Sequence, residues 1–129
     1  MTRTAVADNS GVETPREQVN TVSSFIDAWA VYGGTESRLE WLREGPVDGD
    51  LSNNGARLLL TEDGYLPTAS IRGDAASAPT MERVGRLHAI ADPDSEIVVT
   101  GDVRANENIA LTAVQTLFAR EHNLSLIHI

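Results

Sequence analysis

Arg104 and Glu107 are the residues whose types and spacing most readily suggest chemistry. They lie three residues apart, just before the longest apolar-periodic stretch of the chain. On a helix this spacing puts both side chains on the same face, at its N-terminal end. From the residues alone, the favoured interpretation is a surface ion pair, which contributes only about 0.3–0.5 kcal/mol when exposed.

A second set of candidate residues, Ser23, Phe25 and Asp27, occupies alternating positions. A short loop at these positions offers a hydroxyl, a backbone carbonyl and a carboxylate. Calcium prefers several hard oxygens of this kind at about 2.3–2.6 Å. The segment is therefore a candidate calcium loop, and the alternative is a helix end with a solvated Asp27.

Length and composition limit the kinds of protein that this chain can form. A fold of 129 residues has room for one core and buries roughly two thirds of its unfolded surface. The net charge of -9 and the pI near 4.6 argue against nucleic acid or an anionic membrane as a partner. The sequence has no apolar run of membrane-spanning length and no visible export signal. It has no cysteine, so neither disulfides nor thiolate chemistry are available.

Local signals predict a helix that begins at Pro15. Thr14 can cap this helix, proline suits the first helical position, and Glu17 completes a capping box. The residues expected on its apolar face are Val19, Val22 and Ile26. The Gly33-Gly34 pair then ends the unit as a turn.

Further elements are expected downstream, and together they predict a mainly α fold. Residues 35–43 form a short second helix, and residues 57–67 suggest a small hairpin around a turn. Residues 106–123 carry the longest helical pattern. The apolar face expected for this last helix consists of Leu111, Val114, Leu117 and Phe118.

Two blocks of the sequence resemble the animal-type haem peroxidases. Residues 101–123, GDVRANENIALTAVQTLFAREHN, resemble the distal-side segment of that superfamily, which follows the pattern GD-x-R-x-x-E, then LT-x-x-HTL-x-x-REHN. Residues 14–33, TPREQVNTVSSFIDAWAVYG, resemble its TPREQ-x-N-x-x-TSF-x-DAS-x-VYG segment. Because both blocks occur in the right order, chance similarity is a poor explanation.

The resemblance implies roles for the charged pair beside haem b. Arg104 matches the family's distal arginine, a permanently charged fork that stabilises negative charge on a peroxide oxygen. Glu107 matches the carboxylate that forms an ester to a haem methyl group. Asn108 stands where one branch of the family has a methionine bonded to haem, so no such extra bond is expected.

The resemblance also implies a calcium ion held at the second set. Ser23 would contribute its hydroxyl, Phe25 its backbone carbonyl and Asp27 the one charged ligand. Trp29 departs from the family, which usually has serine there, because an indole offers no oxygen.

The histidines of the chain do not match the family's catalytic ones. The family's distal histidine precedes this region and its proximal histidine follows it, so residues 1–123 are expected to be part of a larger catalytic domain. His122 is expected to pack or hydrogen-bond, and His88 to be exposed. Residues 124–129, which include His128, resemble a translated sequencing adapter and are expected to be a non-native tail.

The function expected from the resemblance is haem-dependent reduction of hydrogen peroxide, with halides or small organic donors as the reducing substrates and a role in the response to oxidative stress. The absence of cysteine favours a bacterial relative over the disulfide-linked mammalian branch. Two alternatives stay open: a fatty-acid oxygenase on the same scaffold, and a non-enzymatic calcium-binding or interaction module. The oligomeric state and the localisation stay open too.

Overall fold

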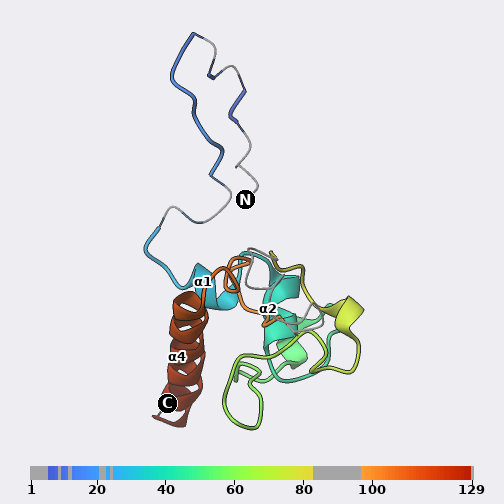
Figure 1. The fold of residues 1–129 in the computed structure, drawn as a ribbon. Coiled ribbons are helices and arrows are strands. Elements are labelled where there is room, and N and C mark those ends of the chain that lie inside the picture. The colour runs from blue at the N-terminus through green and yellow to red at the C-terminus, as the bar shows by residue number, and fades with distance from the viewer. Residues whose placement is uncertain are drawn as a thin grey trace.

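The computed structural model describes residues 6–8, 10–11, 13–20, 23, 25–82 and 97–128. Within these ranges the regular structure is helical and no residue belongs to a named strand, which confirms the mainly α prediction (Figure 1). The α-helices are α1 (Trp29–Tyr32), α2 (Glu36–Leu42) and α4 (Ile109–Ser125), and the 3-10 turns are η1 (Leu51–Asn53), η2 (Ala75–Ser77) and η3 (Leu126–His128).

Helix α2 forms where the sequence predicts it. The Thr35 hydroxyl caps it by accepting a hydrogen bond from the Arg38 N–H group at 3.3 Å. Its buried end carries Trp41 and Leu42, which are 1% and 4% exposed. The side chain of Arg72 then donates to the carbonyl oxygens of Trp41, Arg43 and Gly45, so it satisfies groups that a helix end leaves unpaired.

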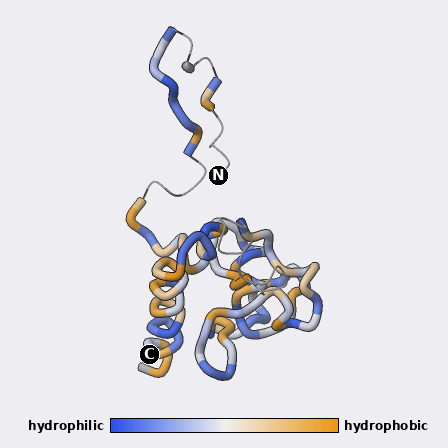
Figure 2. Tube along the Cα trace, viewed as in Figure 1, coloured by the Kyte–Doolittle hydropathy of each residue, from blue (hydrophilic) through white to orange (hydrophobic). Residues whose placement is uncertain are grey.

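Helix α4 also forms as predicted, but the face that it buries is not the predicted one. Its buried residues are polar or small, namely Gln115, Thr116, Ala119 and Asn123. Three of the four residues expected in the core are exposed, namely Val114, Leu117 and Phe118. Figure 2 shows hydrophobic positions recurring along this helix. The prediction failed because the described part of the chain packs against the other side of the helix, where polar side chains reach backbone partners.

The predicted helix from Pro15 is wrong. Residues 13–20 are exposed and non-helical, and Gln18 instead forms an antiparallel bridge with Val6. Figure 1 shows this segment extending away from the rest of the molecule. Val19 is 44% exposed and Ile26 fully so, while Val22 lies outside the described residues. Good capping signals did not suffice, because a short helix depends on tertiary packing of its apolar face.

The predicted hairpin at residues 57–67 forms only its turn. The Thr61 carbonyl accepts from Gly64 N–H, and Thr61 N–H donates to the Tyr65 carbonyl at 2.9 Å. The flanking residues do not pair with each other, since Leu58 forms an isolated bridge with Arg43. The hairpin prediction is therefore wrong beyond the turn itself.

The core gathers side chains from loops as well as helices. Its buried hydrophobic members are Trp41, Leu42, Leu58, Leu66, Met81, Val99, Ala105 and Ala119. Several come from segments without regular structure, and these are joined by isolated backbone hydrogen bonds, such as Leu59 N–H to the Leu42 carbonyl and Val99 N–H to the Pro67 carbonyl, together with side-chain hydrogen bonds. Within the described ranges, no helix has both the length and the apolar character that crossing a bilayer requires.

Candidate functional site

Arg104 and Glu107 lie on the turn that precedes α4, not on the helix itself. Residues 103–106 form this turn, and the Glu107 N–H group donates to the Arg104 carbonyl at 2.8 Å. The helix starts after Asn108, whose side chain accepts a hydrogen bond from Leu111 N–H at 2.9 Å. The prediction that a helical face presents the pair is therefore wrong. Their proximity comes from the turn.

The partner of Arg104 is Asp102. Nε and Nη2 of the guanidinium donate to Oδ1 and Oδ2 of the carboxylate at 2.9 and 2.7 Å. The Arg104 backbone N–H also donates to Oδ1, at 2.9 Å. The Asp102 side chain is 6% exposed and the Arg104 side chain 45%. Among the described residues nothing accepts a hydrogen bond from Nη1, so one end of the fork is held and the other is free.

Opposing effects set the pKa values of this pair. Burial raises the pKa of Asp102, but hydrogen bonds from Arg104 and the positive charges of Arg104 and Arg38 together hold it below its ordinary value. The hydrogen bonds to Asp102 raise the pKa of Arg104, with its partial burial acting against them. The carboxylate is ionised and the guanidinium charged at neutral pH.

The end of helix α1 fixes the position of Asp102. Asp102 N–H donates to the Ala30 carbonyl at 3.0 Å, and the Thr100 hydroxyl donates to the Asp102 carbonyl at 2.9 Å. Gly101 packs so closely that a Cβ there would lie 2.7 Å from the carbonyl oxygens of Trp29 and Ala30. Only glycine fits at this contact.

Arg38 of α2 approaches the same region. Its Nη1 donates to the Thr100 carbonyl at 2.7 Å and its Nη2 to the Thr80 carbonyl at 2.9 Å. Burial lowers the pKa of Arg38, and the charge of Asp102 opposes that shift. The buried carboxylate of Asp102 therefore lies in the field of two arginines, of which only Arg104 bonds to it among the contacts of the described residues.

Glu107 is exposed and forms no ion pair with Arg104, so the ion-pair interpretation of these two residues is wrong. Within the described ranges, its carboxylate makes no hydrogen bond either. The sequence analysis missed Asp102. The signal that could have found it is the aspartate two residues before Arg104, a spacing at which an Asp side chain commonly bonds the backbone N–H ahead of it.

The predicted calcium residues lie together in an exposed loop. The Ser23 hydroxyl donates to Oδ2 of Asp27 at 2.6 Å and accepts from Phe25 N–H at 3.2 Å. Oδ1 of Asp27 accepts from Trp29 N–H at 2.9 Å, at the start of α1. The Ser23 hydroxyl and then the Trp29 N–H group hold the pKa of Asp27 below its ordinary value. Trp29 thus contributes a donor here rather than an oxygen.

This loop has the right kind of atoms for calcium, but little charge. The oxygens of Ser23 and Asp27 are adjacent, although each is engaged with the other. In the part of the chain that the structure describes, no group of three or more His, Cys, Asp or Glu residues could hold a metal ion. A cation here would depend on one carboxylate and on neutral oxygens.

His122 has the structural role expected of it. Its Nδ1 lies 2.8 Å from the Tyr32 hydroxyl and its Nε2 2.9 Å from the Ala56 carbonyl. The two rings meet edge to face, with centroids 5.3 Å apart. Because both ring nitrogens are engaged, His122 cannot ligate iron in this arrangement. His88 and the side chain of His128 lie outside the described residues.

Comparison with known proteins gives consistent matches. The family model for animal haem peroxidases matches residues 1–126. The chain is 35% identical over 119 residues to thyroid peroxidase of Homo sapiens, which covers 92% of this chain and 12% of that protein. It is 38% identical to the Rattus norvegicus thyroid peroxidase over the same shares of each chain.

A peroxidasin homologue from Caenorhabditis elegans is 34% identical over 118 residues, which is 85% of this chain and 8% of that protein. The chain therefore spans about an eighth or less of the relatives described here. These relatives are animal proteins, so they lend no support to the expectation of a bacterial one.

Proposed function

Because the chain belongs to the animal haem peroxidase family, we propose that the protein of which it is part reduces hydrogen peroxide to water. The two electrons come from a halide or a small organic donor, and two protons complete the two water molecules. Haem, the cofactor that gives the family its name, would supply the redox chemistry when bound, and we propose that it is haem b. The residues of this chain contribute binding, orientation and charge.

The observation that carries this proposal is that only part of the Arg104 guanidinium is hydrogen-bonded within the fold. Asp102 holds Nε and Nη2, while Nη1 has no acceptor among the described residues and the side chain is 45% exposed. A fixed, permanently charged donor can stabilise the peroxide oxygen that gains negative charge as the O–O bond breaks. A lysine could not be held in this way, because its ammonium group is not a planar fork of N–H donors.

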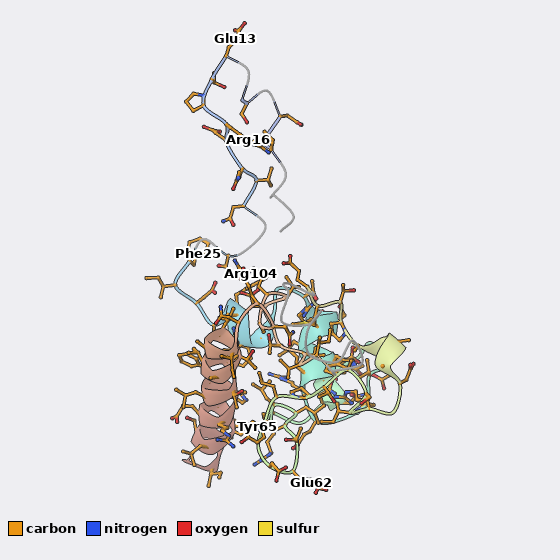
Figure 3. All side chains as sticks on the ribbon, viewed as in Figure 1. Glu13, Arg16, Phe25, Glu62, Tyr65 and Arg104 are labelled. Atoms are coloured by element: carbon orange, nitrogen blue, oxygen red, sulfur yellow. The ribbon has the colours of Figure 1, made fainter. Side chains whose placement is uncertain are left out.

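The described residues include two charged groups that could lie at the edge of a haem. A cationic fork and an unpaired carboxylate, Arg104 and Glu107, are exposed on one turn, as Figure 3 shows for Arg104. The iron ligand is a different matter, since both nitrogens of His122 are engaged. We therefore assign neither iron ligation nor proton transfer to the described histidine.

Two further roles belong to the same proposal. Glu107 would hold haem through an ester to a haem methyl group: a methyl C–H bond would give way to the new C–O bond, and hydrogen peroxide would take the two electrons and leave as water. The exposed carboxylate of Glu107 supports this role. Ser23, Phe25 and Asp27 bind calcium, which the adjacent oxygens of Ser23 and Asp27 support. Both roles also follow from the match of these residues to the family pattern.

Arg104→Gln tests the proposed reaction in the full-length, haem-loaded protein. The variant is expected to react with hydrogen peroxide about 100- to 1000-fold more slowly, because it loses the charge that stabilises the transition state. Stopped-flow absorbance at the Soret band measures the rate. Arg57→Gln is the matched control, since Arg57 is an exposed arginine whose ion pair among the described residues is with exposed Glu44.

Each outcome separates this proposal from its alternatives. Normal kinetics in Arg104→Gln would remove the proposed role of Arg104. A wild-type protein that oxygenates a fatty acid without consuming peroxide would be an oxygenase on this scaffold. A protein that binds calcium but takes up no haem would be a non-enzymatic module.

A further inference from the structure

We propose that Asp102 is a positioning residue for peroxide reduction, whose buried carboxylate fixes the Arg104 guanidinium so that the end of the fork at Nη1 stays available to donate to the substrate. This inference rests on the proposed function and names a residue that acts through Arg104. Asp102 itself does not touch the reacting atoms.

The geometry of the pair carries the inference. One carboxylate receives three hydrogen bonds from one residue, from Nε, Nη2 and the backbone N–H of Arg104. Two of these bonds come from the planar guanidinium, so they fix its plane and leave it little freedom to rotate. An arginine with an exposed tip would otherwise sample many rotamers, and ordering it would cost free energy during the reaction.

Asp102 can hold Arg104 only because it is itself held. Its N–H group donates to the Ala30 carbonyl of α1, and its carbonyl accepts from the Thr100 hydroxyl. Gly101 sits against the carbonyl oxygens of α1 with no room for a side chain. The backbone that carries the Asp102 carboxylate is therefore fixed at its N–H group, at its carbonyl group and at the preceding residue.

The charges around Asp102 favour its ionised form. Arg104 faces it from its own turn and Arg38 faces it from α2, while α1 contributes backbone groups only. Glu82 and Glu107 act on Arg104 from further away and favour its charged form. Since the pKa of Asp102 is depressed in the folded protein, the pair persists at neutral pH and is lost as the pH falls through that depressed value.

Asp102→Asn tests the inference in the full-length, haem-loaded protein. Asparagine keeps one acceptor oxygen but turns an N–H group toward Nη2 and removes the charge. The variant is expected to lose about 10- to 100-fold in kcat/KM for hydrogen peroxide, because small misplacements of a catalytic group cost this much. In an Arg104→Gln background, the same change should cost less than about twofold.

A spectroscopic measurement follows the pair directly. With 15N-arginine labelling, the Nε–H signal of Arg104 should exchange slowly with water in the wild type and quickly in Asp102→Asn. In the wild type, protection of this Nε–H group relative to free arginine at the same pH should persist at neutral pH and be lost as the pH falls through the depressed pKa of Asp102. Asp63→Asn is the matched control, because Asp63 contacts Arg120 through its backbone carbonyl and not its carboxylate.

The outcomes distinguish this inference from the function on which it rests. Equal losses from Asp102→Asn in both backgrounds would show a general structural role and overturn the positioning role alone. Normal peroxide kinetics in Arg104→Gln would remove the role of Arg104 and this inference with it, whereas a haem-loaded wild type that does not consume peroxide would overturn the proposed function. If Asp102→Asn fails to fold, the wild-type measurement decides: fast exchange at neutral pH, as for exposed Arg57, would contradict the inference.

Discussion

Arg104 shows how one side chain can be both part of the structure and available to a substrate. Two of its nitrogens belong to the fold through the buried carboxylate of Asp102, and the third is free in the described part of the molecule. Burying the carboxylate is costly unless it is paired, so the fold retains the pair on energetic grounds alone. Under the proposed function, stability and reactivity would depend on the same two residues.

Glu107 offers a second test at the residue scale. If it bonds covalently to haem, acid-acetone extraction after exposure to peroxide should leave haem on the wild-type protein and remove it from Glu107→Gln. Glu121→Gln changes an exposed glutamate of α4 and should retain haem. Free extraction from the wild type would show that Glu107 is merely a solvated carboxylate on the turn.

The sequence offers Arg104 and Glu107 as candidate site residues but does not show the contacts that organise them. The match of both residues to the family pattern can be read from the sequence. The pairing of Arg104 with Asp102 cannot, because it depends on a turn whose geometry is set by α1 and Thr100. A helix periodicity argument assumes that the residues lie on the helix. Here the Asn108 cap starts the helix just after them.

Among the elements, the success of each prediction depended on how local its cause was. Helix α2 has its cap at Thr35 and its buried end within a few residues, so the sequence predicts it well. The segment after Pro15 has equally good capping signals, but it is exposed and pairs through Gln18 with Val6 instead of forming a helix. The buried face of α4 was unpredictable for the same reason, because polar Gln115 and Asn123 are buried through distant neighbours.

The loop of Ser23, Phe25 and Asp27 provides the test at the element scale. With one carboxylate, it is expected to bind calcium only in about the millimolar range characteristic of sparsely charged sites. Asp27→Ala should abolish this binding in isothermal titration, because it removes the charged ligand. Asp50→Ala is a matched control, since Asp50 also accepts hydrogen bonds from a neighbouring serine in an exposed loop.

Equal calcium affinity in wild type and Asp27→Ala would contradict the proposed calcium site. Asp27 would then serve only to start α1, through its hydrogen bond to Trp29 N–H. In that case the lack of a side-chain oxygen at Trp29 would be one reason why this chain has no calcium site.

At the scale of the whole molecule, polar side chains join segments that secondary structure does not connect. Asn123 near the end of α4 accepts from Leu58 N–H at 2.7 Å and donates to the Leu58 carbonyl at 2.8 Å. Arg120 donates to the carbonyl oxygens of Asp63 and Gly64 and lies over the Tyr65 ring. These contacts hold the loop of residues 58–65 against α4.

Asn123→Ala is expected to lower the free energy of unfolding by about 2–4 kcal/mol, because it leaves the buried backbone groups of Leu58 without partners. Urea denaturation followed by circular dichroism measures the change. Glu121→Ala alters an exposed neighbour on the same helix and should shift stability by less than about 0.5 kcal/mol. Equal effects of the two substitutions would mean that water replaces Asn123 at no cost.

The contact of Gly101 with the end of α1 has a consequence for the order of folding. It joins residues that are far apart in the sequence, so the chain must close a long loop before the two backbones can meet. Contacts of this kind slow folding, because the entropy of closure is lost before the contact rewards it. The turn that carries Arg104 can therefore adopt its folded geometry only after Gly101 and Asp102 have met residues 29–33. A chain cut between these two segments would keep Arg104 and Glu107 but lose the contact that fixes Asp102.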